Sequence, residues 1–185
     1  MAMALNKTMT DNILKKLEKL NTDVKRISKK REFMYGCFVP NPKTTVMFVA
    51  EMPSSSKKWN SIWGPRVNFN VSPTDMKFMQ ALVKHGFGGS YITDLVKTSS
   101  KPRRPTEDEK KEWRPILKKE IQIIKPRLVV ALKDTAFEAL RDFDFPKGTL
   151  FYGEALYHPA AWIYKNHRSG YMRRIKRLAK YCQSL

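Results

Sequence analysis

Four short runs of apolar residues are spaced along the chain, and each is shorter than a typical helix. They cover residues 45–50, 91–96, 128–132 and 150–157. Runs of this kind, without an alternation of polar and apolar residues, are typical of strands that are buried on both faces. The pattern therefore predicts a parallel sheet that is covered by helices on both sides.

Between these runs, apolar residues recur at intervals of three or four positions, which predicts amphipathic helices. The predicted helices cover residues 11–31, 73–85, 106–125, 134–143 and 169–181. Asp11 is expected to cap the first helix, and Thr106 with Glu109 has the spacing of a capping box. Strands that alternate with helices predict an α/β domain with crossover connections.

Length and composition limit the classes of protein that fit. A chain of 185 residues is expected to form one domain with a sizeable core. With 42% hydrophobic and 29% charged residues, it is too apolar for a disordered polycation and too charged for a membrane protein. No apolar run is long enough to span a membrane, and the first residues lack the apolar core of a signal peptide. We therefore expect a cytoplasmic protein, which would be associated with the nucleoid if it is prokaryotic. Two cysteines, Cys37 and Cys182, are too few for a disulfide scaffold or a four-thiolate metal site.

The charge of the chain favours a polyanionic partner. There are 36 Lys and Arg residues against 17 Asp and Glu residues, which gives a formal net charge of +19. Because each phosphate that a protein neutralises releases counterions, such a charge favours nucleic acid. A basic surface that only keeps the protein soluble is the alternative, and the charge alone identifies no chemistry.

Three polar residues end or follow predicted strands: Glu51, Asp94 and His158. The carboxyl ends of parallel strands meet at one edge of a sheet, where α/β folds usually build their sites, so we expect these residues to converge. The long irregular connection at residues 52–72 leaves the same edge. A single carboxylate or histidine at such a position more commonly has a structural role than a catalytic one. The three residues become candidates for a functional site because they share one location.

Other chemistries are disfavoured because their motifs are missing. The sequence has no glycine-rich phosphate loop, no Gly-x-Ser-x-Gly elbow, and no Cys-x-x-Cys or His-x-x-x-His pair. Glu51 and Asp94 leave a metal-dependent nuclease open, although no convincing third ligand accompanies them. A DNA-binding module that has lost its activity is a further alternative.

Four segments carry recognisable motifs when they are taken together. They are residues 50–54 (Ala-Glu-Met-Pro-Ser), residues 91–97 (Tyr-Ile-Thr-Asp-Leu-Val-Lys), residues 121–132, which have the pattern Ile-x-x-Ile-x-Pro-x-x-Val-Val-x-Leu, and residues 158–160 (His-Pro-Ala). In this order they resemble motifs of the uracil-DNA glycosylase superfamily, and most closely those of its iron–sulfur-cluster branch. The corresponding family motifs are Gly-Glu-Ala-Pro-Gly, Tyr-Ile-Thr-Asn-Val-Val-Lys, Ile-x-x-Ile-x-Pro-x-x-Ile-Val-x-Leu, and His-Pro-Ser or His-Pro-Ala. The similarity extends from about residue 33 to residue 180.

The resemblance implies a three-layer α/β/α sandwich around a mainly parallel, four-stranded sheet. Residues 33–185 would form the glycosylase domain, and residues 1–32 would form a basic helix that packs on it. The resemblance also implies a monomer that binds DNA, flips a nucleotide out of the helix, and hydrolyses its glycosidic bond without a metal or cofactor.

The same resemblance assigns roles to individual residues. His158 would donate a hydrogen bond to the departing base, and Glu51 would orient water and stabilise the positively charged sugar. Phe69 would stack on the flipped base, with Trp59 or Trp63 as alternatives and a core position for Phe69 as another. The remaining implied DNA contacts are an apolar wedge (Trp162, Ile163, Tyr164), phosphate ligands (Lys165, Arg168) and backbone contacts (Ser54, Ser55).

The chain departs from the cluster-bearing branch at the cysteines. Where that branch has two of its four ligands, this chain has Thr98 or Ser99 and then Trp113. We therefore expect no iron–sulfur cluster, and we expect Trp113 to pack in its place.

A second departure concerns the base. The family reads uracil with an Asn, and Asp94 stands at that position. An ionised carboxylate only accepts hydrogen bonds, so it would repel O4 of uracil and suit the exocyclic amine of cytosine. This predicts excision of a modified cytosine, such as a hypermodified base of viral DNA, and a role in antiviral defence. If Asp94 points away or carries a proton, ordinary uracil repair is expected, and the sequence leaves both alternatives open.

Overall fold

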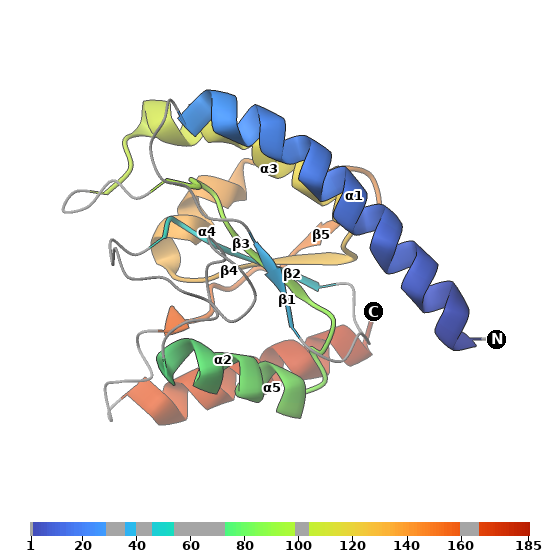
Figure 1. Cartoon of the computed structure of the whole chain (residues 1–185). Coiled ribbons are helices and arrows are strands. Elements are labelled where there is room, and N and C mark those ends of the chain that lie inside the picture. Colours follow the sequence, from blue (N-terminus) through green and yellow to red (C-terminus); the bar gives the residue numbers. More distant parts are fainter. Residues whose placement is uncertain (1, 29–35, 40–45, 54–72, 99–103, 160–166) are drawn as a thin grey trace.

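The structure is a computed structural model, and it describes residues 2–28, 36–39, 46–53, 73–98, 104–159 and 167–185. Figure 1 shows a central sheet that lies between two layers of helices. The prediction of a three-layer α/β/α sandwich is therefore confirmed.

The sheet has five strands within the described residues: β1 (Cys37–Phe38), β2 (Val46–Ala50), β3 (Tyr91–Asp94), β4 (Leu128–Ala131) and β5 (Leu150–Phe151). Their order is β1-β3-β2-β4-β5, and every neighbouring pair is parallel except β1 with β3. The three central strands are buried along their whole length, which explains why β2 and β4 are apolar throughout; β3 ends in two buried polar residues, Thr93 and Asp94.

The sheet differs from the prediction at both of its edges. The sequence gives no sign of β1, because two residues are too few to show a pattern. The strand predicted at residues 150–157 is reduced to β5, because the chain bends at Gly153 and Glu154 and returns to the sheet only at a single bridge between Leu132 and Leu156.

Five helices are described: α1 (Ala2–Ser28), α2 (Pro73–Lys84), α3 (Glu107–Ile124), α4 (Asp134–Arg141) and α5 (Arg168–Gln183). The prediction that Asp11 caps the first helix is wrong, because α1 begins at Ala2 and Asp11 lies inside it. The preceding residues include Ala2, Ala4 and Leu5, whose high helix propensity extends the helix toward the N-terminus.

The start of α3 is as predicted. The hydroxyl of Thr106 accepts a hydrogen bond from the Glu109 N–H at 3.2 Å, and the Thr106 N–H donates to the Glu109 carboxylate at 2.9 Å. This capping box satisfies two backbone groups that an uncapped helix would leave to solvent, and so it fixes where the first turn of α3 begins.

Different helices cover the two faces of the sheet. One face packs against α2 and α5, around residues such as Phe48, Ile92 and Tyr171. The other packs against α1, α3 and α4, around Met47 and Trp113. Residues that alternate along one strand therefore face different layers.

The helix α1 lies along α3 on the outside of the second layer (Figure 1). Leu20 and Val24 of α1 are buried against this layer, and Asp23 forms an ion pair with Lys119 of α3. None of the helices in the described parts of the chain has an apolar stretch long enough to cross a membrane.

Candidate active site at the carboxyl edge of the sheet

Two of the predicted site residues lie at the ends of neighbouring central strands. Glu51 follows β2, and Asp94 is the last residue of β3. The strands are in register, with Ala50 opposite Asp94, and the N–H of Val96 donates to the carbonyl of Glu51 at 3.0 Å. The backbones of Glu51 and Asp94 are thus adjacent at the carboxyl edge of the sheet.

His158 reaches the same edge from the far end of the chain. The bridge between Leu156 and Leu132 attaches this segment just beyond the end of β4, and His158 follows two residues later and is half-buried. Arg168, the first residue of α5, is exposed. The other predicted contact residues lie outside the described part of the chain: Ser54, Ser55, Phe69, Trp162, Ile163, Tyr164 and Lys165.

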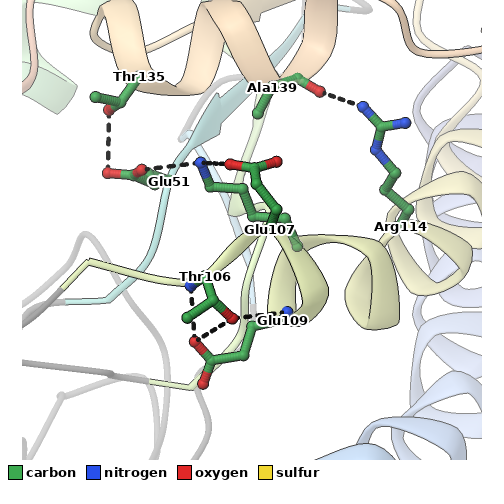
Figure 2. Close-up of polar contacts among 8 residues, drawn as sticks. Glu51, Thr106, Glu107, Glu109, Arg114, Thr135 and Ala139 are labelled. Atoms are coloured by element: carbon green, nitrogen blue, oxygen red, sulfur yellow. Dashed lines mark hydrogen bonds and ion pairs between the residues drawn. The ribbon is translucent and has the colours of Figure 1, made fainter.

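The carboxylate of Glu51 is held by side chains from two helices (Figure 2). The Thr135 hydroxyl donates to Glu51 Oε2 at 3.0 Å, and Lys110 Nζ lies 3.6 Å from Oε1. Lys110 also binds the exposed carboxylate of Glu107 at 2.9 Å. Because Lys110 lies beyond hydrogen-bond distance of Oε1, that oxygen keeps acceptor capacity for a water molecule.

The positions of these partners follow from how α3 and α4 begin. The capping box of Thr106 sets the first turn of α3, where Lys110 donates its N–H to the Thr106 carbonyl at 3.0 Å. Thr135 lies in the first turn of α4. The first turns of two helices therefore each contribute a side chain that contacts the Glu51 carboxylate.

The backbone at the end of β4 has an unusual conformation. Lys133, which precedes α4, has φ = 83° and ψ = 152°, a region that residues with a side chain rarely adopt. Its N–H donates to the Leu156 carbonyl at 2.6 Å. The strained residue thus ties the beginning of α4, and Thr135 with it, to the segment that leads to His158.

The side chain of Asp94 lies on the other side of the sheet from that of Glu51. Asp94 shares a face with Ile92, which packs in the layer of α2 and α5, whereas Glu51 contacts α3 and α4. Asp94 is only 1% exposed. Burial raises the pKa of the Cys37 thiol to about 12, and the charge of Asp94 contributes to this shift.

A second polar cluster, which no sequence motif predicts, lies inside the protein beneath α1. Lys97 Nζ donates to Glu120 Oε2 at 2.6 Å and to the Asp94 carbonyl at 2.6 Å, and it also contacts the Thr93 hydroxyl. Glu120 accepts further hydrogen bonds from Thr93 and from Tyr91. Burial, together with the Glu120 carboxylate, raises the pKa of Tyr91 well above its usual value.

This cluster lines the floor of a cavity of about 290 Å³ between α1 and the sheet. The polar groups of Lys97 and Glu120 are already used by one another and by their neighbours. The cluster is therefore a closed network that supports the fold, and it offers no binding group to a ligand.

The described residues do not match a metal site or an iron–sulfur site. No three His, Cys, Asp or Glu side chains among them are close enough to hold a metal ion. Thr98 and Trp113, at positions where the resemblance predicts cluster ligands, are fully buried, and the two cysteines lie on β1 and α5. A four-thiolate cluster does not fit this set of donors.

Sequence reasoning missed Lys110 and Thr135 as partners of Glu51. Lys110 has the sequence context of an ordinary surface lysine, and Thr135 lies just beyond the motif at residues 121–132. Their contact with Glu51 depends on how α3 and α4 pack on the sheet, and no local pattern encodes this.

Comparison with protein-family models gives a match over most of the chain. Residues 38–183 match the family model described as the uracil DNA glycosylase superfamily. No curated protein matches the chain.

Proposed function

The chain belongs to the uracil DNA glycosylase superfamily, and from this premise we propose that it hydrolyses the N-glycosidic bond of a nucleotide flipped out of DNA. The observation that supports this most strongly is the carboxylate of Glu51, which is nearly buried and fixed at the carboxyl edge of the sheet. The net charge of +19 fits a partner made of phosphates.

In the proposed mechanism, the bond between C1′ and the base breaks, and its electron pair leaves with the base. Positive charge then develops on the sugar, and the Glu51 carboxylate stabilises it while Oε1 orients the attacking water. The water oxygen bonds to C1′, and the proton that it releases neutralises the anionic base. Thr135 and Lys110 hold the carboxylate, so that little reorganisation is needed during the reaction. His158 is proposed to donate a hydrogen bond to the base as it becomes anionic.

The positions of Glu51 and Asp94 suit the two halves of one nucleotide. Their backbones are adjacent but their side chains lie on opposite sides of the sheet edge. We propose that the sugar lies beside Glu51 and the base beside Asp94. This arrangement favours a glycosylase over a nuclease in which both carboxylates would bind the same metal ion.

Asp94 is proposed to determine which base is excised. A buried carboxylate facing O4 of uracil would repel it, and such a mismatch typically costs about 1–3 kcal/mol. We therefore propose that the substrate is a base with an exocyclic amine, specifically a modified cytosine. A hypermodified viral base would imply a role in antiviral defence. Uracil repair is the competing outcome.

The deciding experiment uses duplexes that contain uracil, hypoxanthine, cytosine, 5-hydroxymethylcytosine or glucosylated cytosine. Abasic sites are scored by alkaline cleavage, with and without EDTA. We expect release of a modified cytosine that EDTA does not affect, and we expect Asp94→Asn to shift the preference toward uracil. Robust uracil release that Asp94→Asn leaves unchanged would contradict the role of Asp94. Tight binding without any abasic sites would favour an inactive DNA-binding module, and cleavage that EDTA abolishes would favour a nuclease.

A further inference from the structure

The helix α5 holds the segment that immediately precedes His158. Arg174 Nη1 donates to the Ala155 carbonyl at 2.6 Å, and Nε lies 3.3 Å from a carboxylate oxygen of Glu154. The guanidinium group of the same Arg174 lies over the ring of Tyr157, 4.0 Å from its centre. One side chain of α5 therefore contacts three of the four residues before His158.

The ring of Tyr157 is also enclosed from a second side. It stacks on Tyr171 of α5, with 6.4 Å between the ring centres and 19° between the ring planes. A Cβ atom at Gly170 would lie 3.3 Å from Tyr157, so a glycine lets the helix approach the ring this closely. Tyr157 thus lies between the guanidinium of Arg174 and the first turns of α5.

The remaining residue of this segment is held by the sheet. The N–H of Leu156 donates to the Ala131 carbonyl at 2.9 Å, and the Leu156 carbonyl accepts from Lys133 at 2.6 Å. Each residue from 154 to 157 consequently has a fixed contact, either with α5 or with the end of β4. These contacts fix the position and direction of the backbone that leads to His158.

We propose that Arg174 is the positioning residue of His158, a role that rests on the proposed function. A planar guanidinium can donate to a carbonyl in its plane while its face covers an aromatic ring, and a lysine ammonium cannot do both. Loss of Arg174 releases the Ala155 carbonyl and the Tyr157 ring together. His158 then loses its alignment with the departing base, while Glu51 and its partners on α3 and α4 remain in place.

Arg177 provides a matched control. It lies one turn further along α5 and binds the same Glu154 carboxylate at 2.5 Å. Among the contacts of the described residues, it reaches neither Ala155 nor Tyr157. Arg174→Gln and Arg177→Gln therefore remove the same charge from the same helix and the same ion-pair network.

The test compares these variants in single-turnover excision with enzyme in excess, on the duplex that the wild type processes. We expect Arg174→Gln to lower the excision rate about 10- to 100-fold, the range expected when a catalytic group is misplaced by about 1 Å. Arg177→Gln should stay within about twofold of the wild type, a small change typical of an exposed ion pair. Arg174→Lys should lie between the two. Equal losses in the two Gln variants would overturn the proposal.

A second measurement does not require activity. The chain has three histidines, so the ring resonances of His158 can be identified in an NMR spectrum by comparison with a His158→Asn variant. They should shift and broaden in Arg174→Gln and stay unchanged in Arg177→Gln. Unchanged His158 resonances in Arg174→Gln would overturn the positioning role. Absence of excision by the wild type would instead refute the proposed function, and the NMR comparison would still report on Arg174.

Discussion

Two lysine–carboxylate pairs connect α3 to the sheet, and they differ in almost every respect. Lys97 and Glu120 lie 2.6 Å apart in the interior, with side chains 2% and 5% exposed. Lys110 and Glu51 lie 3.6 Å apart at the carboxyl edge, with side chains 13% and 10% exposed.

The two pairs differ in how much hydrogen-bond acceptor capacity the carboxylate keeps. Both oxygens of Glu120 accept hydrogen bonds from protein groups. Lys97 donates to three acceptors: the Thr93 hydroxyl, the Asp94 carbonyl and the Glu120 carboxylate. Glu51 has one oxygen fixed by Thr135 and the other only loosely paired. A closed network specifies the fold, whereas a carboxylate with spare acceptor capacity near solvent can act on a substrate.

The largest expected effect comes from breaking the interior pair. Lys97→Met leaves the Glu120 carboxylate buried without its cation, which typically costs about 3–5 kcal/mol of folding stability. Urea denaturation measures this loss. Lys110→Met at the edge should cost less than this, because Lys110 lies 3.6 Å from Glu51 and the Thr135 hydroxyl still donates to the carboxylate. Equal losses of folding stability in Lys97→Met and Lys110→Met would contradict the distinction between a structural interior pair and a functional edge pair. Lys97→Met combined with Glu120→Leu should recover part of the loss.

The next effect is catalytic. Glu51→Gln should lower the single-turnover excision rate about 100-fold or more, because the amide keeps the shape of the side chain but loses the negative charge that stabilises the sugar. The free energy of unfolding should change little, because the amide oxygen can still accept the hydrogen bond from Thr135. Glu107→Gln is the matched control, since it removes the exposed partner of Lys110 and should leave the rate within about twofold of the wild type. A Glu51→Gln enzyme with full activity would remove Glu51 from the mechanism.

A smaller effect is expected at the residue that fixes the edge carboxylate. Thr135→Val removes the hydroxyl that donates to Glu51 Oε2 and keeps the volume of the side chain. A hydrogen bond to a charged group is typically worth about 1.5–3 kcal/mol, so we expect the excision rate to fall about tenfold. Thr135→Ser keeps the donor and should retain most of the rate. If Val and Ser behave alike, the hydroxyl does not act through Glu51.

The smallest effect concerns strain at the same edge. Lys133→Gly should raise the free energy of unfolding by about 1 kcal/mol, because glycine adopts a positive φ without steric cost. Lys133→Ala keeps the strain and should bring no gain. A loss of stability in the glycine variant would show that the backbone at Lys133 is not strained.

Much of the fold could be predicted because it follows from hydrophobic periodicity. The buried strands β2 and β4 are uninterrupted apolar runs, and β3 lies within a mostly apolar segment. Thr106 and Glu109 have the spacing of a capping box, which correctly predicts the start of α3. The prediction failed where no pattern exists, as in the two-residue β1, or where propensity extended a helix, as in α1.

The candidate site was predictable only in part. Counting along the strands places Glu51, Asp94 and His158 at one edge, because carboxyl ends of parallel strands meet there. It does not say which face each side chain takes, since this depends on where each strand ends. Nor does it find Lys110 or Thr135, whose contacts with Glu51 join segments far apart in the sequence.

The central position of β2 also determines how the protein opens. The carbonyls of Val49, Ala50 and Glu51 accept hydrogen bonds from Leu132 on one side and from Leu95 and Val96 on the other, at 2.8–3.0 Å. Freeing this segment requires neighbouring strands to separate on both sides, so its amides should exchange with deuterated water only when the whole domain unfolds. The backbone that carries the Glu51 carboxylate thus belongs to the part of the molecule that we expect to open most rarely.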